Sequence, residues 1–84
     1  MKAKKSLGQN FLNSKVVAQD IVRAAKLMSS DTVLEIGPGK GFLTAGLLAS
    51  SAHVVAVEKD DRMIPLLSEK FALEIQNKKL TLIH

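Results

Sequence analysis

Three glycines at alternate positions stand out in this 84-residue sequence as residues whose type and spacing indicate chemistry. Gly37, Gly39 and Gly41 directly follow the short, mostly apolar run of residues 33–36. Glycine is needed where the backbone takes a positive φ or comes close to a ligand, because a Cβ would collide there. A helical pattern begins at once, and the N-terminus of a helix directs unpaired N–H groups and a positive dipole end at whatever occupies the turn. The stretch therefore predicts a site for a nucleotide-type cofactor.

The spacing of the glycines narrows the class of cofactor. A dinucleotide fingerprint, G-x-G-x-x-G, would place its third glycine at position 42, where this sequence has Phe42. A phosphate-binding P-loop needs G-x-x-x-x-G-K-[ST], and Lys40 alone between two glycines does not supply it. S-adenosylmethionine suits the turn better, because it carries no phosphate and needs close backbone approach and hydrogen bonding. The competing interpretation is an ordinary strand-to-helix turn, which three glycines in five residues disfavour.

The second candidate is Glu58, which ends the β-branched run of residues 54–57, about 20 residues beyond the glycines. In a doubly wound sheet, an acidic residue at the end of the second strand accepts hydrogen bonds from ribose hydroxyls. The alternative is a solvated charge at a strand end, since Lys59, Asp60 and Asp61 follow it. Because Glu58 occurs together with the glycine turn, a role as ribose ligand is preferred.

Length and composition limit the classes of protein. At 84 residues the chain is at most one small domain and is too short for most complete enzymes. It has no cysteine, so neither disulfides nor thiolate metal sites hold it together. His53 and His84 lack the spaced partners of a metal site, and no metal is expected. No apolar run approaches the length of a membrane span and no signal peptide is visible, so a cytoplasmic location is expected.

Basic residues gather in the first part of the chain. Residues 1–30 hold six basic residues and one acidic residue, a net charge of +5, whereas the remainder has a net charge of −1. Lys2, Lys4 and Lys5 are the densest group. A basic end on a nearly neutral body suggests contact with a nucleic acid. A solubilising tail explains the three lysines equally well.

The elements that must position these residues alternate between helix and strand. The periodicity predicts helix, strand, helix, strand, helix and strand, at about residues 13–28, 32–36, 41–50, 54–57, 60–71 and 80–83. This alternation predicts an α/β fold with a parallel sheet and right-handed crossovers. The strands are apolar at successive positions, as a sheet covered on both faces requires.

The same periodicity predicts which side chains face the core. On the first helix the apolar face includes Val17, Ile21 and Met28. The third helix is expected to begin at a cap formed by Asp60 or Asp61. Its apolar side is expected to hold four residues: Met63, Leu66, Leu67 and Phe71.

With these residues laid out, the chain resembles the N-terminal part of the bacterial ribosomal RNA adenine dimethyltransferases over its whole length. Residues 5–12, Lys-Ser-Leu-Gly-Gln-Asn-Phe-Leu, resemble the opening motif of that family. Residues 31–41 resemble its cofactor turn, and residues 57–60 its ribose-binding strand end. Many class I methyltransferases share the cofactor turn, whereas the opening motif is much more specific. The macrolide-resistance rRNA methyltransferases share a similar layout.

The resemblance implies a Rossmann-like class I methyltransferase fold, of which the sequence holds the first half. It implies S-adenosylmethionine as cofactor and the transfer of two methyl groups to N6 of each of two adjacent adenines near the 3′ end of small-subunit rRNA. The partner would be that rRNA in the immature small ribosomal subunit. The implied cofactor ligands are Gln9, Asn10, Leu12, Gly37, Gly39, Gly41 and Glu58. No catalytic residue is assigned, because the catalytic loop and the C-terminal RNA-recognition domain of the family would follow His84.

Residues 1–84 are therefore predicted to be the N-terminal S-adenosylmethionine-binding portion of a methyltransferase domain, inactive alone. Residues 1–12 form a basic opening segment that is expected to be mobile, with Lys2, Lys4 and Lys5 as RNA contacts. An unpaired apolar edge at residues 33–36 predicts self-association. Three alternatives stay open: a non-catalytic RNA-binding module, an NAD-binding piece, and a macrolide-resistance type of rRNA adenine methyltransferase.

Overall fold

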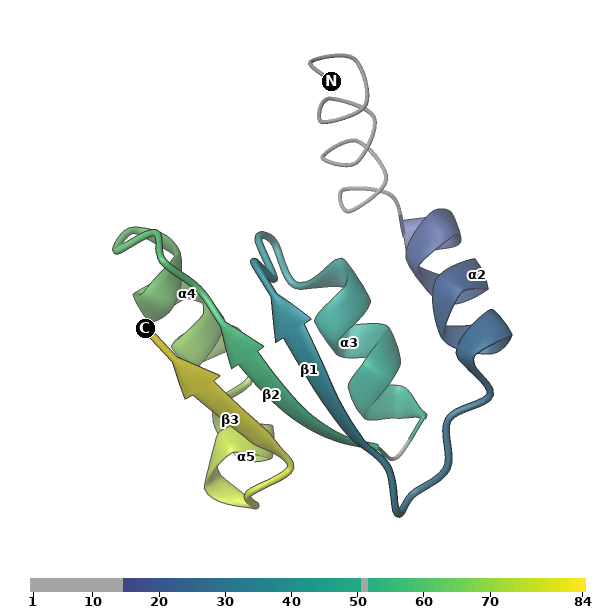
Figure 1. Cartoon of the computed structure of the whole chain (residues 1–84). Coiled ribbons are helices and arrows are strands. Elements are labelled where there is room, and N and C mark those ends of the chain that lie inside the picture. The colour runs from purple at the N-terminus through teal and green to yellow at the C-terminus, as the bar shows by residue number, and fades with distance from the viewer. Residues whose placement is uncertain (1–14, 51) are drawn as a thin grey trace.

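The computed structural model describes residues 15–50 and 52–84. Within these residues, seven elements follow one another: α2 (Lys15–Ala25), β1 (Thr32–Ile36), α3 (Phe42–Ala49), β2 (His53–Val57), α4 (Met63–Lys70), α5 (Ala72–Gln76) and β3 (Leu80–Ile83) (Figure 1). The opening segment lies outside the described residues, and with it six of the predicted site residues: Lys2, Lys4, Lys5, Gln9, Asn10 and Leu12.

The strands form one parallel sheet in the order β1-β2-β3, which confirms the predicted α/β arrangement. Thr32 pairs with His53 at one end of the β1–β2 ladder and Ile36 pairs with Val57 at the other. The ladder continues beyond β1, because the N–H of Gly37 donates a 2.8 Å hydrogen bond to the carbonyl of Val57. This register places the glycine turn directly beside the residue that follows β2, which is Glu58.

One face of the sheet carries the core. Side chains alternate across a strand, and on this face Val54, Ala56 and Leu80 are buried. They pack with Leu47 and Leu48 of α3, and with further core residues from α4 and the break before α5. All helices that contribute to this core therefore lie on the same side of the sheet.

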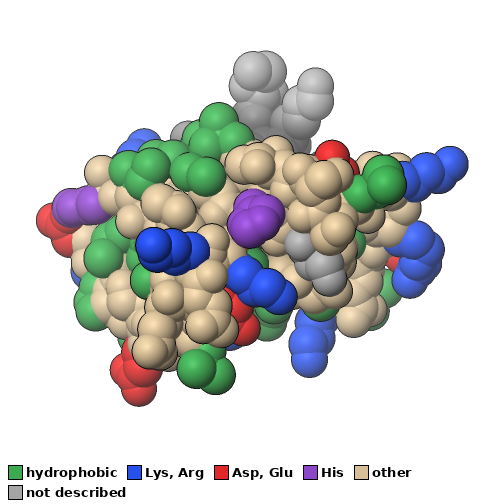
Figure 2. All heavy atoms as spheres, turned by 90° about the horizontal axis from the view of Figure 1, so that it is seen from below, with side chains coloured by type: hydrophobic (Ala, Val, Ile, Leu, Met, Phe, Trp, Pro, Cys, Tyr) green, Lys and Arg blue, Asp and Glu red, His purple; other side chains and the backbone are tan. Residues whose placement is uncertain are grey.

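The opposite face carries exposed apolar side chains. Leu34 is 64% exposed, Ile36 is 69% exposed, and Ile83 is exposed as well. Hydrophobic side chains gather along the upper margin of Figure 2. The prediction of a sheet covered on both faces is therefore wrong for the described part of the chain, because the covering helices pack on one side only.

The first described helix buries a different stripe from the predicted one. Ala18 is buried, Val22 packs against the core, and Met28 is exposed. Ile21 is exposed, contrary to the prediction, whereas Val22 packs where α3 has Gly46, a position at which a Cβ would lie 3.0 Å from Cγ2 of Val22. Met28 is exposed for another reason: α2 stops at Ala25, and Lys26 takes a left-handed φ of 51°. The chain then turns so that Leu27, and not Met28, reaches the core.

The predicted cap of α4 by Asp60 or Asp61 is wrong, because the N-cap position is Arg62 and no side chain caps the helix. Asp60 Oδ1 accepts a 2.9 Å hydrogen bond from the N–H of Arg62, and the helix begins at Met63. The Arg62 side chain also bonds Asp60, and this hydrogen bonding holds the pKa of the Asp60 carboxyl below its usual range. Leu66 is exposed, contrary to the prediction, whereas Leu67 and Phe71 are buried.

Candidate functional site

The turn between β1 and α3 takes a positive φ at each of its three glycines. The values are 70° at Gly37, 57° at Gly39 and 86° at Gly41. L-amino acids with a side chain rarely adopt this conformation, whereas glycine does so without a steric cost. The backbone path therefore explains the alternating glycines that the sequence shows.

The space around the three glycines differs. Among the described residues, a Cβ on Gly37 would meet no atom within 4 Å, and one on Gly39 would meet only the carbonyl oxygen of Gly37 at 4.0 Å. A Cβ on Gly41 would lie 2.8 Å from Cε2 of Phe71. Gly37 and Gly39 thus border open space through which a ligand can approach the backbone. Gly41 is buried and is required for packing against Phe71, whatever contact it makes with a ligand.

Glu58 lies against the glycine turn. Its Oε1 accepts a 3.2 Å hydrogen bond from the N–H of Gly39, and its Oε2 accepts a 3.0 Å bond from the N–H of Asp60. The residue is 6% exposed. A carboxylate has about four lone-pair positions, so these two bonds leave acceptor capacity for a ligand. The structure thus brings together the two sequence features that predicted a cofactor site.

A second buried carboxylate, Glu35, was missed by the sequence analysis. It is 5% exposed, and the hydroxyl of Thr44 donates a 2.6 Å hydrogen bond to its Oε1. Burial raises the pKa of Glu35, the Thr44 bond opposes this effect, and the charge of Glu58 adds a further increase. The signal in the sequence was an acidic residue inside an otherwise apolar strand.

The glycine turn also borders a small pocket of about 140 Å³, formed with the side of α4. Its walls come from both elements: Gly39, Lys40, Met63, Leu66, Leu67 and Lys70. Another pocket, of about 270 Å³, adjoins Glu35 and Ile36 and is lined largely by apolar side chains of α2, β1 and α3.

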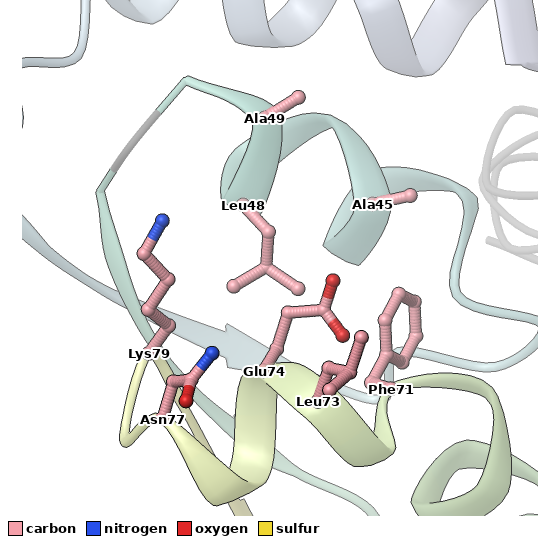
Figure 3. A pocket seen from close by; sticks show the side chains of 8 residues that line it. All are labelled: Ala45, Leu48, Ala49, Phe71, Leu73, Glu74, Asn77 and Lys79. Atoms are coloured by element: carbon pink, nitrogen blue, oxygen red, sulfur yellow. The ribbon is translucent and has the colours of Figure 1, made fainter.

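A larger pocket of about 350 Å³ lies between α3 and α5, away from the turn (Figure 3). In this view Leu48 of α3 and Glu74 of α5 point toward one another. None of the glycines lines it. Its size alone does not make it the candidate site, because the features that predicted a cofactor lie at the other end of α3.

The described residues offer neither a metal-ion site nor a membrane-spanning helix. Within residues 15–50 and 52–84, no group of three or more His, Cys, Asp or Glu side chains is placed to hold a metal ion. His84 contacts the side chain of Asp61, so it is less isolated than the sequence indicated. No described helix has both the length and the apolar character needed to cross a membrane.

Comparison with protein families supplies the deciding observation. The family profile described as "Ribosomal RNA adenine dimethylase" matches residues 1–84, the whole chain. This chain belongs to the ribosomal RNA adenine dimethylase family. The resemblance inferred from the opening motif and the cofactor turn is therefore confirmed.

Two curated relatives of this family member carry the name Ribosomal RNA small subunit methyltransferase A. The protein from Dehalococcoides mccartyi is 52% identical over 71 residues, which cover 84% of this chain and 24% of the relative. The protein from Caulobacter vibrioides is 47% identical over 81 residues, covering 96% of this chain and 31% of the relative. This chain thus spans 24% and 31% of the length of these two relatives.

A solved structure shares the fold of this chain. The crystal structure of the 23S rRNA methyltransferase ErmE matches with a TM-score of 0.70 and 28% identity. The match covers 83% of this chain and 28% of ErmE. The predicted Rossmann-like methyltransferase fold is confirmed by this match.

Proposed function

We propose that this member of the ribosomal RNA adenine dimethylase family binds S-adenosylmethionine at the glycine turn. It would form the cofactor-binding part of an rRNA adenine N6,N6-dimethyltransferase. The observation that carries the proposal is the hydrogen bond between Glu58 and the N–H of Gly39, which joins the acidic strand end to the turn. In parallel α/β sheets, ligands bind in the crevice outside the carboxyl ends of the strands, where these two residues lie.

The residues present fit such a cofactor. The open space beside Gly37 and Gly39 allows the backbone to be approached closely, and no side chain of residues 15–50 and 52–84 fills it. The remaining lone pairs of Glu58 can accept hydrogen bonds from a ribose diol. Both glycines also precede the N-terminus of α3, whose first N–H groups have no intrahelical acceptor. When bound, the cofactor supplies an electrophilic sulfonium methyl group.

The proposed substrate is small-subunit ribosomal RNA, modified at N6 of two adjacent adenines near its 3′ end. The names of the relatives support this choice, because identity to the small-subunit enzymes is 52% and 47%, against 28% to the 23S enzyme ErmE. Contact with the immature small ribosomal subunit would use the basic opening segment. This substrate would place the site of action in the cytoplasm.

The role of this chain in the reaction is to bind and orient. Methyl transfer to an adenine amine depends on alignment of the reactants and on polar stabilisation, and it requires no protein nucleophile. Glu58 and the turn would fix the ribose and the adjoining part of the cofactor. We assign no residue of this chain to contact with the adenine amine.

Ligand titration separates this proposal from its alternatives. The 84-residue chain would be titrated by calorimetry with S-adenosylmethionine, with NAD and with a small-subunit rRNA helix. We expect saturable binding of S-adenosylmethionine and no binding of NAD. Binding of the RNA helix alone would favour a non-catalytic RNA-binding module, and preference for NAD would refute the cofactor assignment.

A further inference from the structure

The side chain of Lys70, at the end of α4, reaches across to the glycine turn. Its Nζ donates a 2.9 Å hydrogen bond to the backbone carbonyl of Lys40, thirty positions away in the chain. The same ammonium lies 5.3 Å from the ring centroid of Phe42 and 5.5 Å from that of Phe71. A cation at this distance over an aromatic face is attracted by the ring quadrupole. One side chain thus contacts the turn, the first residue of α3 and the end of α4.

The peptide between Lys40 and Gly41 is held at both of its polar groups. Lys70 bonds the carbonyl of Lys40, and the N–H of Gly41 donates a 2.9 Å bond to the carbonyl of Pro38. Fixing both ends of a planar peptide fixes its orientation. That orientation sets the φ of 86° at Gly41, the N-cap residue of α3.

The turn is also pressed against the same end of α4. A Cβ on Gly41 would lie 2.8 Å from Cε2 of Phe71 and 3.4 Å from Cδ2 of Leu67. The backbone of the turn therefore packs so closely against Phe71 and Leu67 that no room is left for a side chain at Gly41. Lys70 and Phe71 are consecutive residues, so one holds the turn by a polar bond while the other supports it from the core.

The hydrogen bonds of the turn to distant side chains come from two elements. Glu58, which follows β2, accepts a hydrogen bond from the N–H of Gly39. Lys70, at the end of α4, donates a hydrogen bond to the carbonyl of Lys40. We propose that Lys70 is a positioning residue for the cofactor turn, holding the Lys40–Gly41 peptide in the orientation that presents Gly39 and the start of α3 to the cofactor. The expected effect of Lys70 on cofactor binding rests on the proposed function. The effect of Lys70 on the conformation of the turn can be tested without the cofactor.

The test uses two variants of Lys70 in the 84-residue chain. Lys70→Met keeps the length of the stem and removes the donor and the charge, whereas Lys70→Arg keeps both. Lys79→Met is the matched control, because Lys79 is an exposed lysine that lines the pocket between α3 and α5. S-adenosylmethionine affinity would be measured by calorimetry, and the amide resonances of Gly39 and Gly41 by NMR without ligand.

We expect Lys70→Met to weaken S-adenosylmethionine binding about 3- to 10-fold, a loss of about 0.7–1.4 kcal/mol. We also expect it to shift both glycine amide resonances. Lys70→Arg should restore the affinity to within about twofold, and Lys79→Met should change neither readout. Unchanged amide resonances in Lys70→Met would overturn the inference, and so would unchanged affinity in a chain that binds the cofactor. If the parent chain binds no S-adenosylmethionine while the amides shift in Lys70→Met, the positioning contact stands and the proposed function fails.

Discussion

The hydroxyl of Thr44 donates a 2.6 Å hydrogen bond to Oε1 of Glu35, across the interface between α3 and β1. The second oxygen of this buried carboxyl, Oε2, has no hydrogen-bond partner in the described part of the chain. A buried polar atom without a partner carries its full desolvation penalty. One hydrogen bond therefore holds the Glu35 side chain in place. The desolvation penalty of this carboxyl depends on whether it is ionised.

That cost predicts a pH dependence. Burial raises the pKa of Glu35 above its ordinary value of 4.5. A carboxyl whose pKa is raised by folding stabilises the fold fully below its unfolded pKa, and this contribution is lost as the pH rises through the folded pKa. Relative to the parent chain, Glu35→Gln should therefore gain stability as the pH increases from about 4 to 7.

Urea denaturation of both chains across this pH range would measure the difference in unfolding free energy. Asp20→Asn is the control, because Asp20 is an exposed carboxyl paired with Arg23. A difference between Glu35→Gln and the parent chain that does not change with pH would contradict the raised pKa.

Thr44→Val removes the opposing hydrogen bond and should destabilise the fold by about 1–3 kcal/mol at neutral pH.

Replacing Glu58 should weaken cofactor binding. If its carboxylate accepts hydrogen bonds from the ribose, Glu58→Ala should cost about 1.5–3 kcal/mol of S-adenosylmethionine binding energy, the range for a hydrogen bond to a charged group. Because Glu58 also accepts from Gly39 and Asp60, we expect some loss of stability as well. Glu58→Gln keeps the size, and Glu69→Gln, at an exposed position of α4, controls for the loss of charge. Calorimetry that gives equal affinities for parent and Glu58→Gln would remove Glu58 from the ligand set.

The glycines should differ in their tolerance of alanine. At Gly37 the added Cβ has free space, so the left-handed backbone alone costs roughly 1–2 kcal/mol. At Gly41 the Cβ also collides with Phe71, and overpacking adds about 1–3 kcal/mol. In thermal unfolding, Gly41→Ala should therefore have a lower midpoint temperature than Gly37→Ala. Adding Phe71→Leu to Gly41→Ala should recover part of the stability that Gly41→Ala loses. A double variant whose loss of stability equals the sum of the losses in the two single variants would argue against the collision.

The exposed face and edge at β1 predict self-association. In the described sheet β1 pairs only with β2, and Leu34 and Ile36 project apolar side chains into solvent. Unpaired apolar strands of this kind invite pairing with another chain, and a charge on them opposes it. Sedimentation should show mass increasing with concentration, and Leu34→Lys should reduce the effect. Leu73→Lys, which removes an exposed leucine from α5, is the control. A parent chain that stays monomeric at millimolar concentration would be incompatible with this expectation.

We expect the 84-residue chain not to methylate RNA by itself. An adenine taken from its stack is held by aromatic faces and by hydrogen bonds to its edge. The sequence has no Trp, no Tyr and three Phe residues. Phe71 is buried, the ring of Phe42 lies under the ammonium of Lys70, and Phe11, the one remaining aromatic residue, lies outside the described residues. Loss of reactant orientation forfeits roughly 7–11 kcal/mol of barrier lowering.

Radiolabelled methyl transfer to immature small ribosomal subunits would test this expectation. The full-length Caulobacter vibrioides relative serves as the positive control. Transfer above background by the purified 84-residue chain would show that it holds the adenine without the aromatic faces assumed above.

Local features of this fold could be predicted from the sequence. The bounds of β1 match the expected residues 32–36, because an apolar run bounded by polar and glycine residues has little freedom. Glu58 was placed near the glycines because strands in a parallel sheet end at the same edge. Distant contacts between side chains could not be predicted. The bond from Lys70 to Lys40 depends on where the end of α4 lies relative to the glycine turn, and no periodicity in the sequence encodes that placement.

Which faces of the sheet and helices are buried was the feature that the sequence predicted least well. Leu34, Val55 and Ile83 are as apolar as their neighbours in the core, so the sequence indicated two covered faces. In the described chain only one face is covered, because helix placement depends on crossover geometry and not on the composition of the strand. Met28 was misplaced because α2 ends at Ala25, before the predicted end of the helix, and Leu66 is exposed although it follows the predicted periodicity of α4.

The spatial order of the strands has a consequence for how the chain acquires its structure during synthesis. Each strand pairs with the one made just before it, with Thr32 meeting His53 and Val54 meeting Leu80. In the described sheet, β2 and then β3 therefore each emerge from the ribosome after the strand with which they pair. Neither of them is inserted between two strands that have already paired. These three strands can assemble in one direction, and pairing of β1 with β2 brings the glycine turn and Glu58 together before β3 has emerged from the ribosome.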